Sequence, residues 1–157
     1  MKGDLTLDAI ISGLVTGTIT IDNSLTPESA LRSVNRVEQV KYEVLKTMPL
    51  STCGSKYLVF DKIGKDVAPA NLDGLLKAKG LVPANPIDVM VWNAKHPEFA
   101  DKTLNCTQWE DVQGNYCCVM FLGLDDSRVI CVDRRYADYD DGWWFVCELV
   151  NTSDVVA

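Results

Sequence analysis

Three apolar runs near the C-terminal end of the chain, separated by short polar turns, constrain the fold more than any other feature. The runs are "NYCCVMFLG" (115–123), "RVICVDRRY" (128–136) and "WWFVCELV" (143–150), and the turns between them are "LDDS" and "ADYDDG". Short runs of β-branched and aromatic residues bounded by Asp and Gly are typical of antiparallel strands joined by tight turns. We therefore predict a three-stranded meander. Because apolar residues occupy both faces of its strands, we expect both faces to be covered.

The chain before the meander predicts one long helix and two further strands. Thr26, Pro27 and Glu28 supply a capping residue, a proline at the first helical position and an acidic side chain in the first turn. Pro49 ends the apolar stripe that follows, so the pattern predicts an amphipathic helix over 26–48. The other predicted elements are strands at 56–62 and 87–93, a short alternating stretch at 18–22, helices at 7–15 and 71–80, and a long loop at 93–113.

No linker, repeat or low-complexity tract interrupts the chain, so we predict a single domain over residues 1–157. The predicted class is α+β, with a mainly antiparallel five-stranded sheet that includes the C-terminal meander. The helix at 26–48 and the shorter helices would pack on this sheet. No apolar run approaches the ~20 residues that a membrane helix needs. The start of the chain lacks a basic stretch followed by an apolar block, so we expect a cytoplasmic location.

The negative charge is concentrated in the last third of the chain. The net charge is −7, and residues 101–157 carry eleven acidic and four basic side chains. Direct binding to nucleic acid is disfavoured, because phosphate contacts need clustered Lys and Arg. A basic protein surface is the more natural partner for such a chain. The composition leaves a homo-oligomer open.

The cysteines favour a reducing compartment. The chain has six of them and no C-x-x-C pair, whereas structural zinc sites usually combine two closely spaced pairs. Four of the six lie inside apolar, strand-like runs, where a thiol behaves as a small buried side chain. We therefore expect reduced, mostly buried thiols, with no metal and no cofactor.

The meander predicts an acidic and aromatic surface at one end of the sheet. Successive strands alternate in direction, so the entrance to the first strand and the turn after the second should lie at the same end. Five carboxylates and six aromatic rings would gather there, with two arginines close behind. The residues are Trp109, Glu110, Asp111, Tyr116, Arg134, Arg135, Tyr136, Asp138, Tyr139, Asp140, Asp141, Trp143 and Trp144. Alternation also predicts that Trp143 and Trp144 point to opposite faces.

Two other interpretations of this stretch compete with the binding surface. Asp and Gly are the residues that hairpin turns require, and strand tryptophans often belong to the core, so the stretch is also compatible with a purely structural role. A calcium loop needs glycine at its sixth position, whereas "DYDDG" has glycine at the fifth. The calcium pattern therefore fails, and we predict no metal site.

Two classes of function follow. The first is a small, acidic, non-enzymatic interaction protein that presents the acidic and aromatic end of its sheet to a basic protein partner. The second is a small hydrolase that uses His96, the single histidine, with Cys106 or with a carboxylate. Nothing in the sequence near His96 orients its ring, so we favour the interaction protein.

Overall fold

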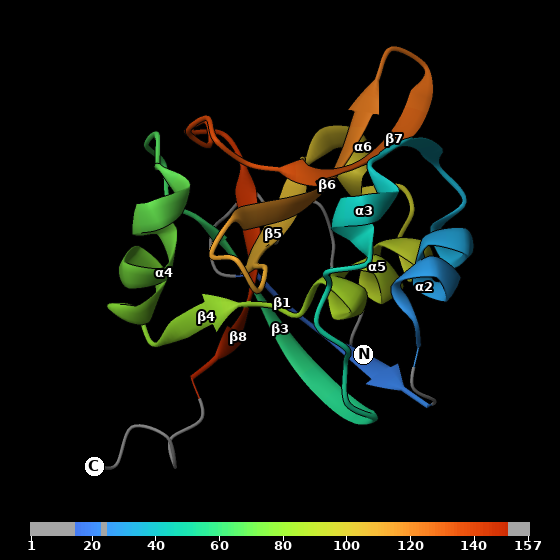
Figure 1. The fold of residues 1–157 in the computed structure, drawn as a ribbon, viewed down its shortest axis with the longest axis horizontal. Helices are drawn as coiled ribbons and strands as arrows, with labels where there is room; N and C mark the ends of the chain where they lie inside the picture. The colour runs from blue at the N-terminus through green and yellow to red at the C-terminus, as the bar shows by residue number, and fades with distance from the viewer. Residues whose placement is uncertain (1–14, 23–24, 151–157) are drawn as a thin grey trace.

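The computed structural model describes residues 15–22 and 25–150, and these residues form one mixed eight-stranded sheet with helices on both faces (Figure 1). The predicted α+β class is therefore correct, but the predicted five-stranded, mainly antiparallel sheet is wrong. The strands are β1 (Val15–Ile21), β2 (Val37–Val40), β3 (Gly54–Lys62), β4 (Leu81–Pro83), β5 (Asn105–Glu110), β6 (Tyr116–Leu124), β7 (Ser127–Arg134) and β8 (Trp144–Leu149).

The sheet order mixes segments that are far apart in the sequence. The strands lie in the order β1-β3-β8-β5-β6-β7-β2, and β4 pairs with the far end of β8. The pairs β2–β7 and β5–β8 are parallel, and the other pairs are antiparallel. The β6–β7 hairpin confirms the first half of the predicted meander. Its second half is wrong, because β8 pairs with β3 and β5 rather than with β7.

The single helix predicted over 26–48 is wrong. The described residues contain five helices: α2 (Pro27–Val34), α3 (Tyr42–Leu45), α4 (Pro69–Lys77), α5 (Pro86–Lys95) and α6 (Phe99–Lys102). The predicted start is correct, since the Thr26 hydroxyl accepts a hydrogen bond from the Ser29 N–H at 3.1 Å. The helix ends at Asn35, which adopts a left-handed conformation with φ of 51°. The valine-rich segment after it becomes the edge strand β2, because β-branched residues favour an extended chain over a helix.

The strand predicted at 87–93 is a helix, α5. The Asn85 side chain caps it by accepting hydrogen bonds from the N–H groups of Ile87 at 2.8 Å and Asp88 at 3.3 Å, and Pro86 occupies its first turn. The helix is buried on nearly all sides, so its apolar run shows neither a clear helical stripe nor a strand alternation. The Asn85 cap is the local feature that distinguishes a helix from a strand in this stretch.

The remaining predicted elements have different outcomes. The strand predicted at 56–62 and the helix predicted at 71–80 correspond to β3 and α4. The long loop predicted at 93–113 is wrong, since this stretch contains the end of α5 and the central strand β5. The helix predicted at 7–15 falls on residues outside the described ones, except for Val15, which begins β1.

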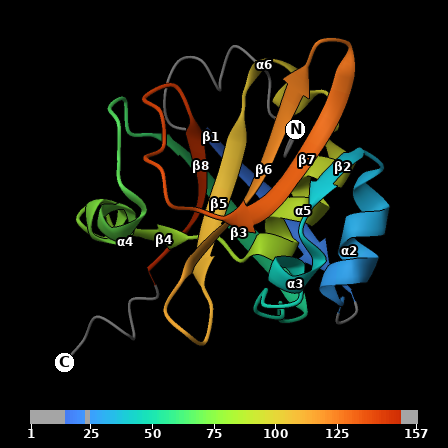
Figure 2. The same ribbon diagram turned by 45° about the horizontal axis from the view of Figure 1, so that its top comes forward.

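Both faces of the sheet are covered, as predicted. The larger core lies between the sheet and the helices α2, α3, α5 and α6, and the smaller core lies under α4 (Figure 2). Phe60, Trp92 and Phe99 form an aromatic cluster in the larger core, with ring centroids between 4.5 and 5.2 Å apart. No helix in residues 15–22 and 25–150 is long and apolar enough to cross a membrane.

Candidate functional site

Residues 136–143, called the acidic loop below, connect β7 to β8 across the face of the sheet that carries α4. Tyr139 anchors the loop at its middle. Its backbone exchanges two hydrogen bonds with Val67, at 2.7 and 3.0 Å, and its side chain is fully buried in the smaller core. The Tyr139 hydroxyl donates to the Gln108 carboxamide oxygen on β5 at 2.8 Å. The loop is therefore fixed to both the sheet and the segment before α4.

Arg135 holds the first half of the acidic loop. Its Nε donates to the Ala137 carbonyl at 2.8 Å, and a terminal nitrogen donates to the Asp138 carbonyl. The guanidinium also lies over the rings of Tyr139 and Trp143, at 5.0 and 4.7 Å from their centroids. Arg135 thus binds backbone oxygens and aromatic faces rather than the loop's carboxylates.

Three carboxylates of the acidic loop point to solvent. Asp138, Asp140 and Asp141 are exposed on either side of the buried Tyr139. Among the residues that the structure describes, none of the three takes part in a salt bridge. The loop therefore presents concentrated negative charge on a conformation that is already ordered.

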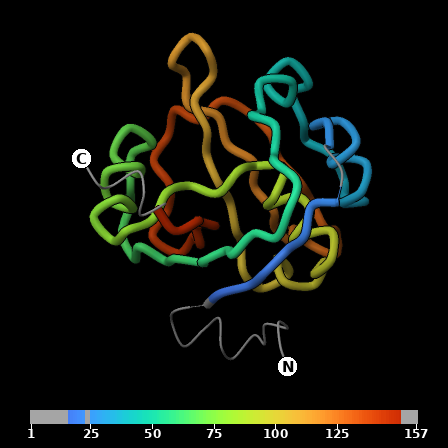
Figure 3. The backbone as a smooth tube through the Cα atoms, turned by 90° about the horizontal axis from the view of Figure 1, so that it is seen from below, coloured from blue at the N-terminus to red at the C-terminus, as the bar shows by residue number. Residues whose placement is uncertain are grey.

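The predicted residues at the end of β5 have mixed roles. The Trp109 side chain is buried in the larger core, where its indole N–H donates to the Thr47 hydroxyl at 2.9 Å. Asp111 shapes the β5–β6 turn, which Figure 3 shows as a gold-coloured hairpin that extends beyond the neighbouring backbone. Arg134 lies 3.9 Å from the Asp111 carboxylate, and Glu110 is exposed. The hairpin therefore combines a buried tryptophan with charged residues at the surface.

The aromatic residues do not gather on one rim. Trp143 packs in the smaller core and Trp144 against the larger one, which confirms that they point to opposite faces. Trp144 pairs with Asn105 at the start of β5, at the other end of that strand from Trp109. Tyr136, the first residue of the acidic loop, is 80% exposed. The structure keeps the ends of β5 and β7 together, since Tyr116 pairs with Glu110 and its carbonyl accepts from the Arg135 N–H. Trp144 lies away from this end because β8 pairs with the start of β5.

The structure places His96 and Cys106 on different faces of the sheet. His96 follows α5 and stacks on Trp92 in the larger core, with ring centroids 4.3 Å apart. Cys106 points into the smaller core, where it is fully buried. Burial raises the pKa of the Cys106 thiol, so the nucleophilic thiolate is disfavoured. His96 and Cys106 therefore do not form a nucleophile and base pair.

The expectation that most thiols are buried is confirmed. Cys53 is exposed, and Cys131 is half-buried. The other four thiols are buried: Cys106, Cys117, Cys118 and Cys147. Burial raises the pKa of Cys147 as well as that of Cys106, as expected for side chains that fill a core.

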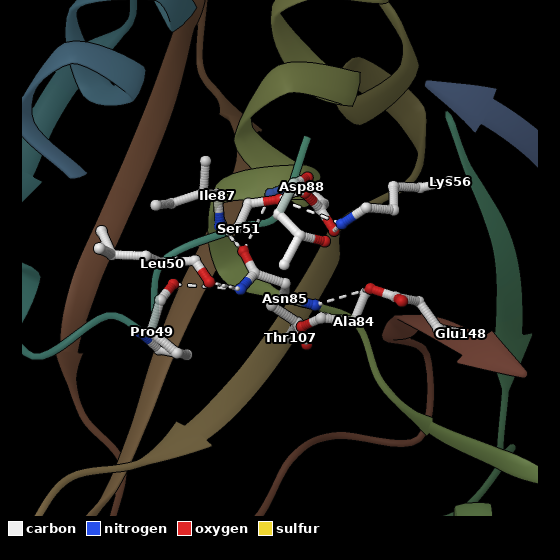
Figure 4. A network of polar contacts seen from close by, with 11 residues as sticks. Pro49, Leu50, Ser51, Lys56, Ala84, Asn85, Ile87, Asp88, Thr107 and Glu148 are labelled. Carbon is white, nitrogen blue, oxygen red and sulfur yellow. Dashed lines mark hydrogen bonds and ion pairs between the residues drawn. The ribbon is translucent and has the colours of Figure 1, made fainter. Parts of the chain in front are cut away.

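A buried polar network at the start of α5 was not anticipated from the sequence (Figure 4). The fully buried Asp88 carboxylate accepts from the Lys56 ammonium at 3.2 Å and from the Ser51 hydroxyl. Lys56 also donates to the Ser51 oxygen at 3.2 Å. The three side chains therefore satisfy one another's hydrogen bonds inside the fold.

The network continues to β8 through Asn85. The backbone N–H of Asn85 donates to the Glu148 carboxylate at 3.1 Å. The side-chain amide of Asn85 donates to the Pro49 and Leu50 carbonyls at 3.1 and 3.2 Å. The network therefore ties the loop before β3, the start of α5 and the end of β8 together. The one local sign of this network in the sequence is Asn85 before Pro86, a pair that marks a capped helix start.

The pH dependence of stability should contain a contribution from Glu148. Burial, together with the nearby Asp88 carboxylate, raises the pKa of Glu148, while the Asn85 N–H and Lys56 oppose the shift. The folded protein then keeps a proton that the unfolded chain has lost. The stabilisation is present below about pH 4, the ordinary range for Glu, and disappears as the pH rises through the raised folded value. In urea unfolding, the free energy of unfolding of the parent should fall relative to that of Glu148→Gln as the pH rises. A difference independent of pH would contradict the assignment.

A second polar feature lies at the β6–β7 turn. A cleft of about 590 Å³ is bordered there by Asp101, Asp125, Asp126 and Arg128. Arg128 binds Asp101 through two hydrogen bonds of 2.9 and 3.0 Å, so two of these charges satisfy each other. No group of three or more His, Cys, Asp or Glu side chains in the described residues is arranged to hold a metal ion. The cleft does not gather the groups of a reactive centre.

Comparison of the chain with protein-family models, with curated proteins and with solved structures gave no match.

Proposed function

We propose that this chain is a non-enzymatic interaction protein that binds a basic segment of a partner protein through its acidic loop. The observation that carries the proposal is the set of exposed carboxylates at Asp138, Asp140 and Asp141, which have no cationic partner among the described residues. A partner's lysines or arginines would supply the missing positive charges. Complementary charges of this kind accelerate association and select the partner.

The rigidity of the acidic loop supports the same proposal. Tyr139 is fixed by the backbone bridge to Val67, and Arg135 fixes the carbonyl groups of Ala137 and Asp138. Binding then costs little further ordering of the loop, which leaves more of the electrostatic attraction to appear as affinity.

The test uses a fluorescent lysine–glycine repeat peptide and measures its anisotropy as the protein is titrated. The affinity should fall as salt is raised, because exposed charges are screened. Changing Asp138, Asp140 and Asp141 together to Asn should weaken binding by about tenfold, the size expected if each exposed carboxylate contributes roughly 0.5 kcal/mol.

The matched control makes the same change in net charge elsewhere. Asp125→Asn, Asp126→Asn and Glu43→Gln remove three exposed carboxylates that lie outside the acidic loop. This control should bind the peptide within about twofold of the parent, since loss of a distant charge is screened. Equal losses in the two triple variants would show that only net charge matters and would overturn the proposal.

A further inference from the structure

A groove lies directly beside the acidic loop. It has a volume of about 470 Å³ and is formed by the segment 65–68 and the first two turns of α4. Val67 lines the groove and pairs with Tyr139 in the acidic loop, so the two features share a wall. Figures 1 and 2 both show the segment before α4 and the loop before β8 side by side.

Small and apolar residues make up five of the eight that line this groove, and the other three are Lys65, Asp66 and Asn71. Ala68, Ala70 and Gly74 leave the space open, and Leu75 is half-buried beside it. The volume falls within the range of roughly 300–1,000 Å³ that is usual for ligand sites. The groove therefore has the size and the lining for an aliphatic side chain and the backbone next to it.

The charges around the groove identify the kind of occupant. Asp138 and Asp140 flank Tyr139 on one side, and Asp66 lies on the rim, whereas Lys65 is the cation among the lining residues. An aliphatic side chain flanked by basic residues would match both the apolar lining and the excess of negative charge. Val67 and Tyr139 are bridge partners, which lie about 5 Å apart, so an extended segment that rises about 3.3 Å per residue can reach from the groove to the acidic loop.

We infer that the partner binds as an extended basic segment that places one aliphatic side chain in this groove and its lysines or arginines against Asp138 and Asp140. The inference rests on the proposed function, because it names the segment that the acidic loop would bind. It adds that affinity comes from an apolar anchor as well as from charge.

Gly74 allows the groove to be filled without disturbing the fold. It lies inside α4 with an ordinary helical backbone, and a Cβ added there would meet nothing within 4 Å. Gly74→Leu should therefore leave the helix intact, since leucine favours a helix more than glycine does. Thermal unfolding of this variant checks that the fold is retained, and Gly74→Ala provides a smaller change of the same kind.

The experiment compares the lysine–glycine repeat peptide with a peptide that carries one leucine at its centre. The parent protein should bind the leucine peptide about tenfold more tightly, as expected when an aliphatic side chain leaves water. Gly74→Leu should remove this preference while leaving binding of the lysine–glycine peptide unchanged. Ser33→Leu, which adds a leucine on the exposed part of α2, should keep the preference and controls for a general increase in apolar surface.

The outcomes separate the two proposals. If the parent binds both peptides equally, or if Gly74→Leu keeps the preference for leucine, the groove assignment is overturned while the acidic loop still stands as the binding site. If the Asp138, Asp140 and Asp141 triple variant binds both peptides as the parent does, the proposed function itself fails, and the groove assignment falls with it.

Discussion

Replacing Asp88 with alanine is expected to lower the free energy of unfolding by about 3–5 kcal/mol, the usual effect of removing one partner from a buried ion pair. The Asp88 side chain is fully buried, and its Lys56 partner is 16% exposed. Without the carboxylate, the Lys56 ammonium stays in a poorly hydrated site without a counter-charge. The Ser51 hydroxyl loses its acceptor at the same time. Urea unfolding monitored by tryptophan fluorescence measures the change.

Two controls test the cause of that loss. Asp101→Ala breaks the ion pair with Arg128, but both side chains are more than a third exposed, so stability should change far less. The double variant Asp88→Leu with Lys56→Met removes both buried charges. It should recover much of the stability lost in Asp88→Ala, because the uncompensated ammonium is gone. A double variant less stable than Asp88→Ala would show that the network is needed for its hydrogen bonds rather than for charge balance.

Replacing Tyr139 with alanine is the second change with a large expected effect. The side chain is fully buried and contacts the rings of Trp143 and Phe145, with centroids 5.6 and 5.2 Å away. Truncation of a buried aromatic ring costs about 3–5 kcal/mol. It should also release the acidic loop from Val67, so affinity for the lysine–glycine peptide should fall even where the rest of the protein stays folded.

Tyr139→Phe separates the hydroxyl group from the ring. This variant keeps the aromatic packing but leaves the buried Gln108 oxygen without its donor, which costs about 1–3 kcal/mol. The loop should stay in place, and peptide binding should be close to that of the parent. Tyr136→Ala, at an 80% exposed position, should change stability little. If Tyr139→Ala were no less stable than Tyr136→Ala, the loop would not be anchored by its tyrosine.

Local patterns predicted those elements whose signal lies within a few residues. The β6–β7 hairpin follows from two apolar runs around Asp125 and Asp126, and the start of α2 follows from Thr26 and Pro27. These signals work because turns and caps depend on neighbouring backbone groups. The predicted strand at 87–93 was wrong because a helix and a strand that are buried on all sides share the same continuous apolar run.

The candidate site was predictable in part. The sequence indicated the three exposed aspartates, since consecutive acidic residues next to glycine are typical of a surface loop. It also predicted the opposite orientation of Trp143 and Trp144, which follows from strand alternation alone. It could not place Trp109 in the core or separate His96 from Cys106, since both results depend on how α5 and β5 pack.

By itself, then, the sequence determined the α+β class, the concentration of negative charge in the last third, the burial of most thiols and the β6–β7 hairpin. Only the tertiary structure decided that β8 enters the sheet between β3 and β5, that the acidic loop consequently crosses over the smaller core, and that Lys56, Asp88 and Glu148 meet. The physical reason is that strand pairing between distant segments is selected by the packing of the whole sheet. Any strand offers the same backbone hydrogen bonds to many partners, so no local pattern specifies which partner it takes.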